Sequence, residues 1–311
     1  MPTLPPPPET ASTLPSPPFV AVRGIPNLRD LGGWPISSST RTRPLSIRRH
    51  YIYRCGEPTS APPSTIGLLT SPPHRIATLF DLRSKAEIEG MQISGEQGRV
   101  VDWPGVKRVE IPVFDERADP AALAIKHAGD MGRGLMKGEE NGKRKEDPFS
   151  VVYKDILESG AAAYETILRH VLEHPPHQEP SKVGEEGEAF LIHCTAGKDR
   201  TGVFCALVLS LCGVADEIVA DEYALSERGL GAWMEHLVGV VVARTGVTEE
   251  QAWKMAGARR ESILDALRFV KEEWGGVEEY FEKMCRVSRE DLEKIKGLLV
   301  VEEEPVCGLN R

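Results

Sequence analysis

The sequence lacks the features of membrane-spanning, disulfide-stabilised and nucleic-acid-binding proteins. Its longest apolar run, 202–214, is well short of the roughly 20 residues that cross a bilayer. No basic segment followed by an apolar one opens the chain, so we expect no secretory signal. Six cysteines without paired short spacing predict free thiols in a cytosolic or nuclear compartment, rather than disulfides or a zinc site. A net charge of −9 disfavours general binding to nucleic acid or anionic membranes.

Proline and glycine are distributed unevenly, and the segments rich in them set the expected domain boundaries. Residues 1–18 contain eight of the 24 prolines and predict a disordered, polyproline-like tail, either without a partner or a ligand for a proline-binding module. Segments 129–148 and 174–188 are polar and contain glycine or proline, which is typical of surface insertions. We therefore expect a single domain, 19–303, that carries both insertions and is followed by a tail at 304–311.

Between these segments, strand and helix patterns alternate. The predicted strands are 75–82, 109–113 and 189–193; the predicted helices are 151–172, 202–212 and several from 216 onward. Ser84 and Glu87 form a capping box that opens a further short helix. Helix N-caps are expected at Thr248 and Ser288, and Gly275 with Gly276 breaks the helical run. This order predicts an α/β fold with a central, mostly parallel sheet flanked by helices and a helical C-terminal third.

The most informative segment joins a short apolar strand to an apolar helix. Between them lies the run His193-Cys194-Thr195-Ala196-Gly197-Lys198-Asp199-Arg200-Thr201-Gly202. A tight loop in this position directs backbone N–H groups and the positive end of a helix dipole at an anion. Gly197 lets the backbone approach that anion closely. We therefore expect a phosphate-binding loop, and the substrate-binding residues are predicted to be His193, Thr195, Ala196, Gly197, Lys198 and Thr201.

The residue types at the two ends of this loop suit attack on a phosphate monoester. A free thiol titrates at about 8.5, but a helix N-terminus and cationic neighbours lower this to roughly 3.5–7.5, so we expect Cys194 to be a thiolate nucleophile. Arg200 offers a planar fork that can bind two phosphate oxygens. His193 is expected to fix the strand–loop junction, and Thr201 to donate to the sulfur as it leaves. Because Arg200 and the amides supply positive charge, we expect no metal or other cofactor.

The same run resembles the signature loop of the protein tyrosine phosphatase superfamily, and its Lys198-Asp199 pair is similar to the bacterial and fungal tyrosine-phosphatase-like branch. Further segments similar to motifs of that branch are 27–33 (NLRDLGG), 53–56 (YRCG), 80–84 (FDLRS), 221–226 (DEYALS) and 276–280 (GVEEY). Cys55 departs from the pattern, in which Ser is usual.

This resemblance implies the cysteine-phosphatase fold and a phosphoric monoester hydrolase. Its expected partner is a phosphorylated protein. The expected substrate residue is phosphotyrosine, and the enzyme could also have dual specificity. Two alternatives stay open. A phosphoinositide or inositol-phosphate phosphatase would need extra basic residues at the pocket mouth, and Arg29, Arg54 and Lys198 are the candidates. A catalytically idle phosphate-binding module is disfavoured because Cys194 and Arg200 are both intact.

The residue that protonates the leaving oxygen is less well specified, and three aspartates are candidates. Asp81 ends a predicted strand, and the resemblance implies a role near the phosphate. Asp199 lies inside the loop, next to Arg200. Asp115 follows a predicted strand, on a loop that could close over the substrate. We also expect Lys198 to face the mouth of the pocket.

Overall fold

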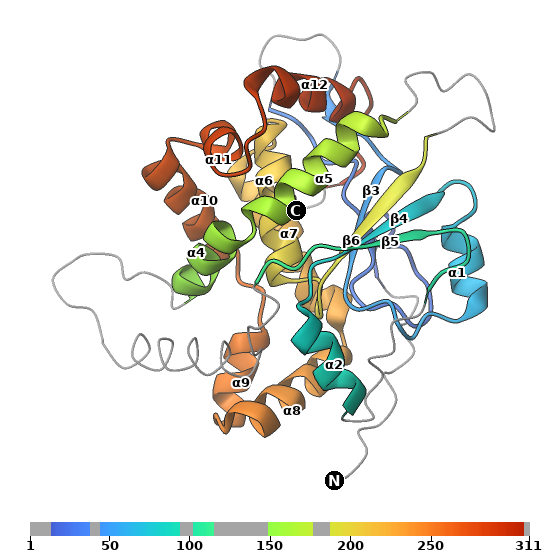
Figure 1. Cartoon of the computed structure of the whole chain (residues 1–311), viewed down its shortest axis with the longest axis vertical. Coiled ribbons are helices and arrows are strands. Elements are labelled where there is room, and N and C mark those ends of the chain that lie inside the picture. Colours follow the sequence, from blue (N-terminus) through green and yellow to red (C-terminus); the bar gives the residue numbers. More distant parts are fainter. Residues whose placement is uncertain (1–13, 38–43, 94–101, 115–148, 177–186, 308–311) are drawn as a thin grey trace, which may run out of the picture.

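The structure is a computed structural model in which residues 14–37, 44–93, 102–114, 149–176 and 187–307 are described. The predicted insertion at 129–148 lies outside these residues, as do most of the N-terminal tail and most of the segment 174–188. Figure 1 shows the sheet on one side of the molecule and most of the helices on the other. Within the described residues, no helix is both long enough and apolar enough to cross a membrane.

A five-stranded sheet forms the centre of the fold. Its strand order is β1–β3–β6–β4–β5, and all neighbours are parallel except β1 and β3. The prediction of a central, mostly parallel sheet is therefore confirmed. The strands are β1 (Arg29–Asp30), β3 (Ile52–Cys55), β4 (Ile76–Asp81), β5 (Lys107–Glu110) and β6 (Ala189–His193). A separate pair is formed by β2 (Ser46–Ile47) and β7 (Val300–Val301).

The two faces of this sheet are covered by different helices. Along β6, Phe190 and Ile192 pack into the large core that the C-terminal helices share. Ala189 and Leu191 point to the opposite face, into a smaller core that includes Leu69 of α1. Alternate residues of a strand point to opposite faces, so a strand buried on both sides is apolar throughout. This explains why 189–193 could be identified from its sequence.

The helices form two groups, before and after β6. The first group is α1 (Pro63–Leu69), α2 (Lys85–Ile93), α4 (Phe149–Ser159) and α5 (Ala161–Glu173). The second group is α6 (Asp199–Leu211), α7 (Asp216–Leu230), α8 (Trp233–Thr245), α9 (Glu249–Ala256), α10 (Arg260–Trp274), α11 (Val277–Lys283) and α12 (Arg289–Leu299). Helix α6 is buried on nearly every face, as its apolar sequence predicts.

The local helix signals are largely confirmed. The Ser84–Glu87 capping box is present at the start of α2, and the Thr248 and Ser288 caps are present in α9 and α12. Gly275 adopts a left-handed conformation that ends α10. The predicted helix 151–172 is instead two helices, α4 and α5, which meet at Gly160.

Both predicted tails begin inside the folded part of the chain. Residues before 19 already contact it, because the carbonyl of Pro18 accepts from the amide of Asp30 at 3.0 Å. At the other end, the amide of Cys307 donates to the carbonyl of Gly33 at 3.0 Å, and the Cys307 side chain is buried. Pro18 and Cys307, both in the predicted tails, therefore contact residues inside 19–303.

A buried carboxylate, Asp30, joins β1 to the turn before β3. Its Oδ1 accepts from the amide of Gly32 at 2.8 Å, and its Oδ2 accepts from the amide of His50 at 2.9 Å. Burial raises the pKa of Asp30 to about 6, although the two amide donors act in the other direction. The folded protein therefore retains a proton on Asp30 that the unfolded chain releases at lower pH.

We expect Asp30→Asn to gain stability relative to the wild type as the pH rises from 4 to 6. The wild-type contribution is fully present below the unfolded pKa of 3.8 and is lost as the pH rises through the folded pKa of about 6. This difference corresponds to about 3 kcal/mol, and the neutral amide lacks it. Urea unfolding of both proteins across this range measures the effect. A constant difference between them would contradict it.

Candidate active site

The carboxyl ends of three parallel strands meet at Cys194. His193, the last residue of β6, is paired with Cys55 of β3 on one side and with Asp81 of β4 on the other. Cys194 follows directly and is buried. Helix α6 begins five residues later, at Asp199, so the loop and the first turn of the helix bring Cys194 and Arg200 together.

The loop after Cys194 turns its carbonyl groups outward, onto protein donors. The carbonyl of Thr195 accepts from the amide of Glu57 at 2.9 Å. The carbonyls of Ala196 and Gly197 each accept from Nδ2 of Asn27 at 3.1 Å. In a planar trans peptide, the N–H of the next residue points away from the carbonyl. The amides of residues 196–198 therefore point to the inner side of the loop, where they can bind an anion.

Gly197 is required by the geometry of this loop. Its φ is +62°, in the left-handed region that side chains rarely adopt. A Cβ at this position would lie 1.9 Å from the carbonyl oxygen of Cys55. The loop is therefore in direct main-chain contact with the end of β3.

A buried group of charged residues supports the loop from behind. Glu222 of α7 accepts from Nε of Arg29 at 2.7 Å and from a terminal nitrogen of Arg54 at 2.6 Å. The other terminal nitrogen of Arg54 donates to the carbonyl of Gly197 at 2.7 Å. Arg29 also donates to Oδ1 of Asn27, which turns the Asn27 amide nitrogen toward the loop. Glu222 thus orients the two side chains that hold loop carbonyls, Arg54 directly and Asn27 through Arg29.

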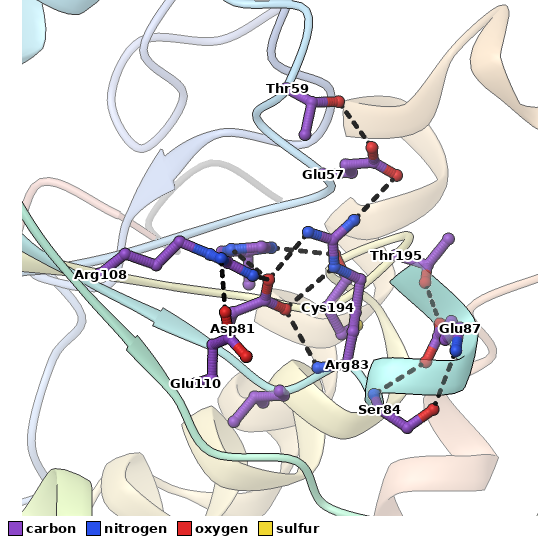
Figure 2. Close-up of polar contacts among 12 residues, drawn as sticks. Glu57, Thr59, Asp81, Arg83, Ser84, Glu87, Arg108, Glu110, Cys194 and Thr195 are labelled. Atoms are coloured by element: carbon purple, nitrogen blue, oxygen red, sulfur yellow. Dashed lines mark hydrogen bonds and ion pairs between the residues drawn. The ribbon is translucent and has the colours of Figure 1, made fainter. Parts of the chain in front are cut away.

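Arg200 is held by a carboxylate from a different element, Glu87 of α2. Both terminal nitrogens of Arg200 donate to Glu87, each at 2.7 Å. The Thr195 hydroxyl donates to the same carboxylate, which also caps its own helix at Ser84 (Figure 2). Burial alone would raise the pKa of Glu87, but Arg200 outweighs it and lowers the pKa. The guanidinium is therefore fixed in orientation.

Asp81 is surrounded by positive charge (Figure 2). It accepts from Nε of Arg83 at 2.9 Å and from Arg108 at 2.6 Å, and it lies 3.7 Å from Nε2 of His193. Burial acts to raise the pKa of Asp81, but these neighbours reverse the effect and lower it strongly. Burial lowers the pKa of His193 to about 4, so its ring is neutral near pH 7. The two arginines therefore hold Asp81 ionised.

Asp199 has a more open setting. Its side chain is 32% exposed. The Tyr153 hydroxyl donates to its Oδ1 at 3.2 Å, and Nζ of Lys198 lies 3.3 Å from the same oxygen. Asp115, the third predicted candidate, lies outside the described residues.

Lys198 does not face the mouth of the pocket as expected. Its side chain is buried, and its ammonium donates to the carbonyls of Met255 at 2.8 Å and Gly257 at 2.9 Å. Ala196 packs against the apolar cluster of α8 and α9. The loop is therefore tied to the end of α9.

Sequence reasoning missed the carboxylates that support the loop rather than the loop itself. Glu87 was identified only as a helix cap, and its bond to Arg200 spans 113 positions. Glu222 gave one usable signal, since a glutamate on the buried face of α7 needs a charged partner. Among the described residues, no group of three or more His, Cys, Asp or Glu side chains is arranged to hold a metal ion.

The chain is similar in sequence to known proteins. A sequence model described as the tyrosine phosphatase family matches residues 20–301. A protein of Cupriavidus necator, provisionally named a tyrosine-protein phosphatase, is 26% identical over 279 residues, covering 88% of this chain and 85% of its own. The triple specificity protein phosphatase of Mycobacterium tuberculosis is 24% identical over 242 residues, which cover 72% of this chain and 82% of that protein. A crystal structure of P. aeruginosa TpbA is 14% identical, with a TM-score of 0.27, and the match covers 72% of this chain and 96% of that one.

We expect Gly197→Ala to abolish turnover of a phosphate monoester and to destabilise the fold by roughly 2 kcal/mol or more, because Cβ meets the Cys55 carbonyl at a left-handed position. Gly297→Ala is the matched control. It lies inside α12, where an added Cβ would have no atom within 4 Å apart from its own helix backbone. Alanine there should stabilise the fold by about 0.5–1 kcal/mol. Thermal unfolding and phosphate release compare the two. Normal turnover by Gly197→Ala would contradict the loop geometry.

Removing the charge of Glu222 should leave two buried arginines without their carboxylate. We expect Glu222→Gln to destabilise the fold by about 3 kcal/mol. Glu217→Gln removes an exposed carboxylate from the same helix, paired with Arg260 at 2.5 Å, and should cost less than about 1 kcal/mol. Urea unfolding measures both variants, and equal losses would argue against the supporting role of Glu222.

Proposed function

Because this chain belongs to the tyrosine phosphatase family, we propose that it hydrolyses phosphotyrosine in proteins with Cys194 as the nucleophile and Arg200 as the phosphate ligand. The observation that carries this proposal is the loop between these residues. Its carbonyls are occupied by Asn27, Arg54 and the Glu57 amide, so its amides are available to phosphate oxygens. Fixed N–H dipoles of this kind stabilise charge as it develops in the transition state.

The reaction we propose has two steps. The Cys194 thiolate attacks phosphorus, the bond from phosphorus to the ester oxygen breaks, and the tyrosyl oxygen leaves with a proton from a protein acid. Water then attacks the cysteinyl-phosphate, the P–S bond breaks, and the now deprotonated acid takes the proton from water. Inorganic phosphate and the thiolate are the products. Thr201 is proposed to donate to the leaving sulfur; its buried hydroxyl has no hydrogen-bond partner among the described residues.

We assign the acid to Asp199 rather than Asp81. Asp81 binds two arginines, and its lowered pKa leaves it without a proton to donate. Asp199 is partly exposed and adjacent in sequence to Arg200, the proposed phosphate ligand. Asp81 then has only a positioning role. It binds Arg83 and lies 3.7 Å from the ring of His193, the residue before Cys194.

The charge around the loop favours a protein substrate over a phosphoinositide. A phosphoinositide reader would need basic side chains directed at additional phosphates. Arg29 and Arg54 are buried against Glu222, and Lys198 is bound to two carbonyls of the α9 end. The relative from M. tuberculosis is named a triple specificity protein phosphatase, so the test below includes several substrate classes, phosphoinositides among them.

We also propose a reducing compartment, cytosolic or nuclear, because the mechanism needs a free thiol. All six cysteines are buried and unpaired. Proteins of oxidising compartments more often pair such residues. A partner for the proline-rich tail remains a prediction from its sequence.

The first test is phosphate release, with and without a chelator, from a phosphotyrosine peptide, a phosphoserine peptide and soluble phosphoinositides. We expect the phosphotyrosine peptide to be the best substrate and the chelator to have no effect. Cys194→Ser should lower turnover by at least about a thousandfold, because the hydroxyl is a far weaker nucleophile.

Cys212→Ser is the matched control for this test. Cys212 is also buried, and burial raises its thiol pKa to about 12; it is the C-cap residue of α6, at the end of the helix away from the loop. Its replacement should leave turnover unchanged. Equal turnover by Cys194→Ser and the wild type would refute the thiolate mechanism, and no turnover of any substrate by the wild type would favour a binding module.

A further inference from the structure

We infer that two buried tyrosines, Tyr153 of α4 and Tyr223 of α7, form a hydroxyl chain that positions Asp199 for proton transfer. This inference rests on the proposed function, in which Asp199 is the acid. Neither tyrosine is part of the loop, and Tyr153 meets it at the carboxyl group of Asp199. They are therefore positioning residues rather than catalytic ones.

The contacts form a continuous line from α7 to the loop. The Tyr153 hydroxyl lies 3.2 Å from Oδ1 of Asp199 and is hydrogen-bonded on its other side to the Tyr223 hydroxyl. The two rings meet edge to face, with centroids 6.2 Å apart. Both side chains are fully buried. Because both rings are packed inside the protein, the two hydroxyl groups are fixed in position by their surroundings on both helices.

Proton counting gives the direction of the chain when Asp199 is ionised. A carboxylate only accepts, so Tyr153 donates its single hydroxyl proton to Asp199. The Tyr153 oxygen must then accept from Tyr223, which donates in turn. Burial raises the pKa of Tyr153, and the neighbouring Tyr223 and Asp199 add to the rise, so the phenol keeps its proton. The chain therefore stays a donor toward Asp199 throughout the neutral range.

The chain itself is anchored at the start of α6. A Cβ on Gly202 would lie 2.9 Å from the Tyr223 ring, so glycine at this position lets the ring pack directly against the helix. Glu222, the residue immediately before Tyr223, pairs with Arg29 and Arg54, through which it supports the loop. One turn of α7 thus fixes both the loop carbonyls and the tyrosine pair.

The geometry distinguishes the two oxygens of Asp199. The Tyr153 hydroxyl and the Lys198 ammonium both approach Oδ1. Oδ2 is then the oxygen that carries the proton to the leaving group and receives one from water in the second step. Without Tyr153, the carboxyl group can rotate, and fewer molecules present a protonated oxygen to the substrate.

Leaving-group dependence tests this role, because a general acid matters most when the leaving oxygen is strongly basic. We would compare phenyl phosphate, a poor leaving group, with nitrophenyl phosphate, a good one. Tyr153→Phe should lower kcat/KM about tenfold for phenyl phosphate and less than about threefold for nitrophenyl phosphate. In an Asp199→Asn background, the same change should have no further selective effect.

Tyr280→Phe is the matched control. Tyr280 is also a buried tyrosine, and its hydroxyl donates to the carbonyl of Leu157 in α4, 2.7 Å away, rather than to Asp199. It should affect both substrates equally. Equal losses on both substrates in Tyr153→Phe would overturn the inference. Failure of the proposed function is distinguishable, because Cys194→Ser would then retain turnover of both substrates.

Discussion

Glu222 is the residue on which the geometry of the site depends. A carboxylate removed from water must be matched by cations and donors, and here one carboxylate matches two arginines. Arg54 holds a loop carbonyl directly, whereas Arg29 acts through Asn27. If either connection were absent, the loop peptides could rotate and present carbonyl oxygens to an anion. The strength of the anion site is therefore set by a charge that lies outside it.

This arrangement joins parts of the chain that are distant in sequence. Asn27 and Arg29 come from the N-terminal motif, Arg54 from β3 and Glu222 from α7. A second, separate set holds Arg200, with Glu87 of α2 as its carboxylate. Two different carboxylates thus act on the loop: Glu222 through the residues that bind its carbonyls, and Glu87 through Arg200 and the Thr195 hydroxyl.

The parts of the site that could be predicted are those encoded locally. A buried strand, Cys194, Gly197, Arg200 and a buried helix follow one another without interruption, so their order fixes their geometry. The carboxylate partners could not be found in this way, because their contacts depend on how helices pack on the sheet. Lys198 illustrates the limit: its place in the loop suggested an exposed cation, but the fold places carbonyls of α9 within its reach.

In the fold, too, only features encoded in a local stretch of sequence could be predicted. The strand 189–193 was predicted correctly because burial on both faces makes it apolar throughout. The division of 151–172 into two helices was missed because apolar spacing continues across Gly160. For the acid, sequence left three aspartates open, and only the arginines around Asp81 separate it from Asp199.

The contact between Gly197 and residue 55 has a consequence for how this family can vary. It is made by the main chain of β3, through the Cys55 carbonyl, and not by the thiol. Burial raises the pKa of the Cys55 thiol well above its usual value, so it remains a neutral group. A change of side chain at position 55 therefore leaves this main-chain contact in place, whereas any side chain at position 197 would collide with it.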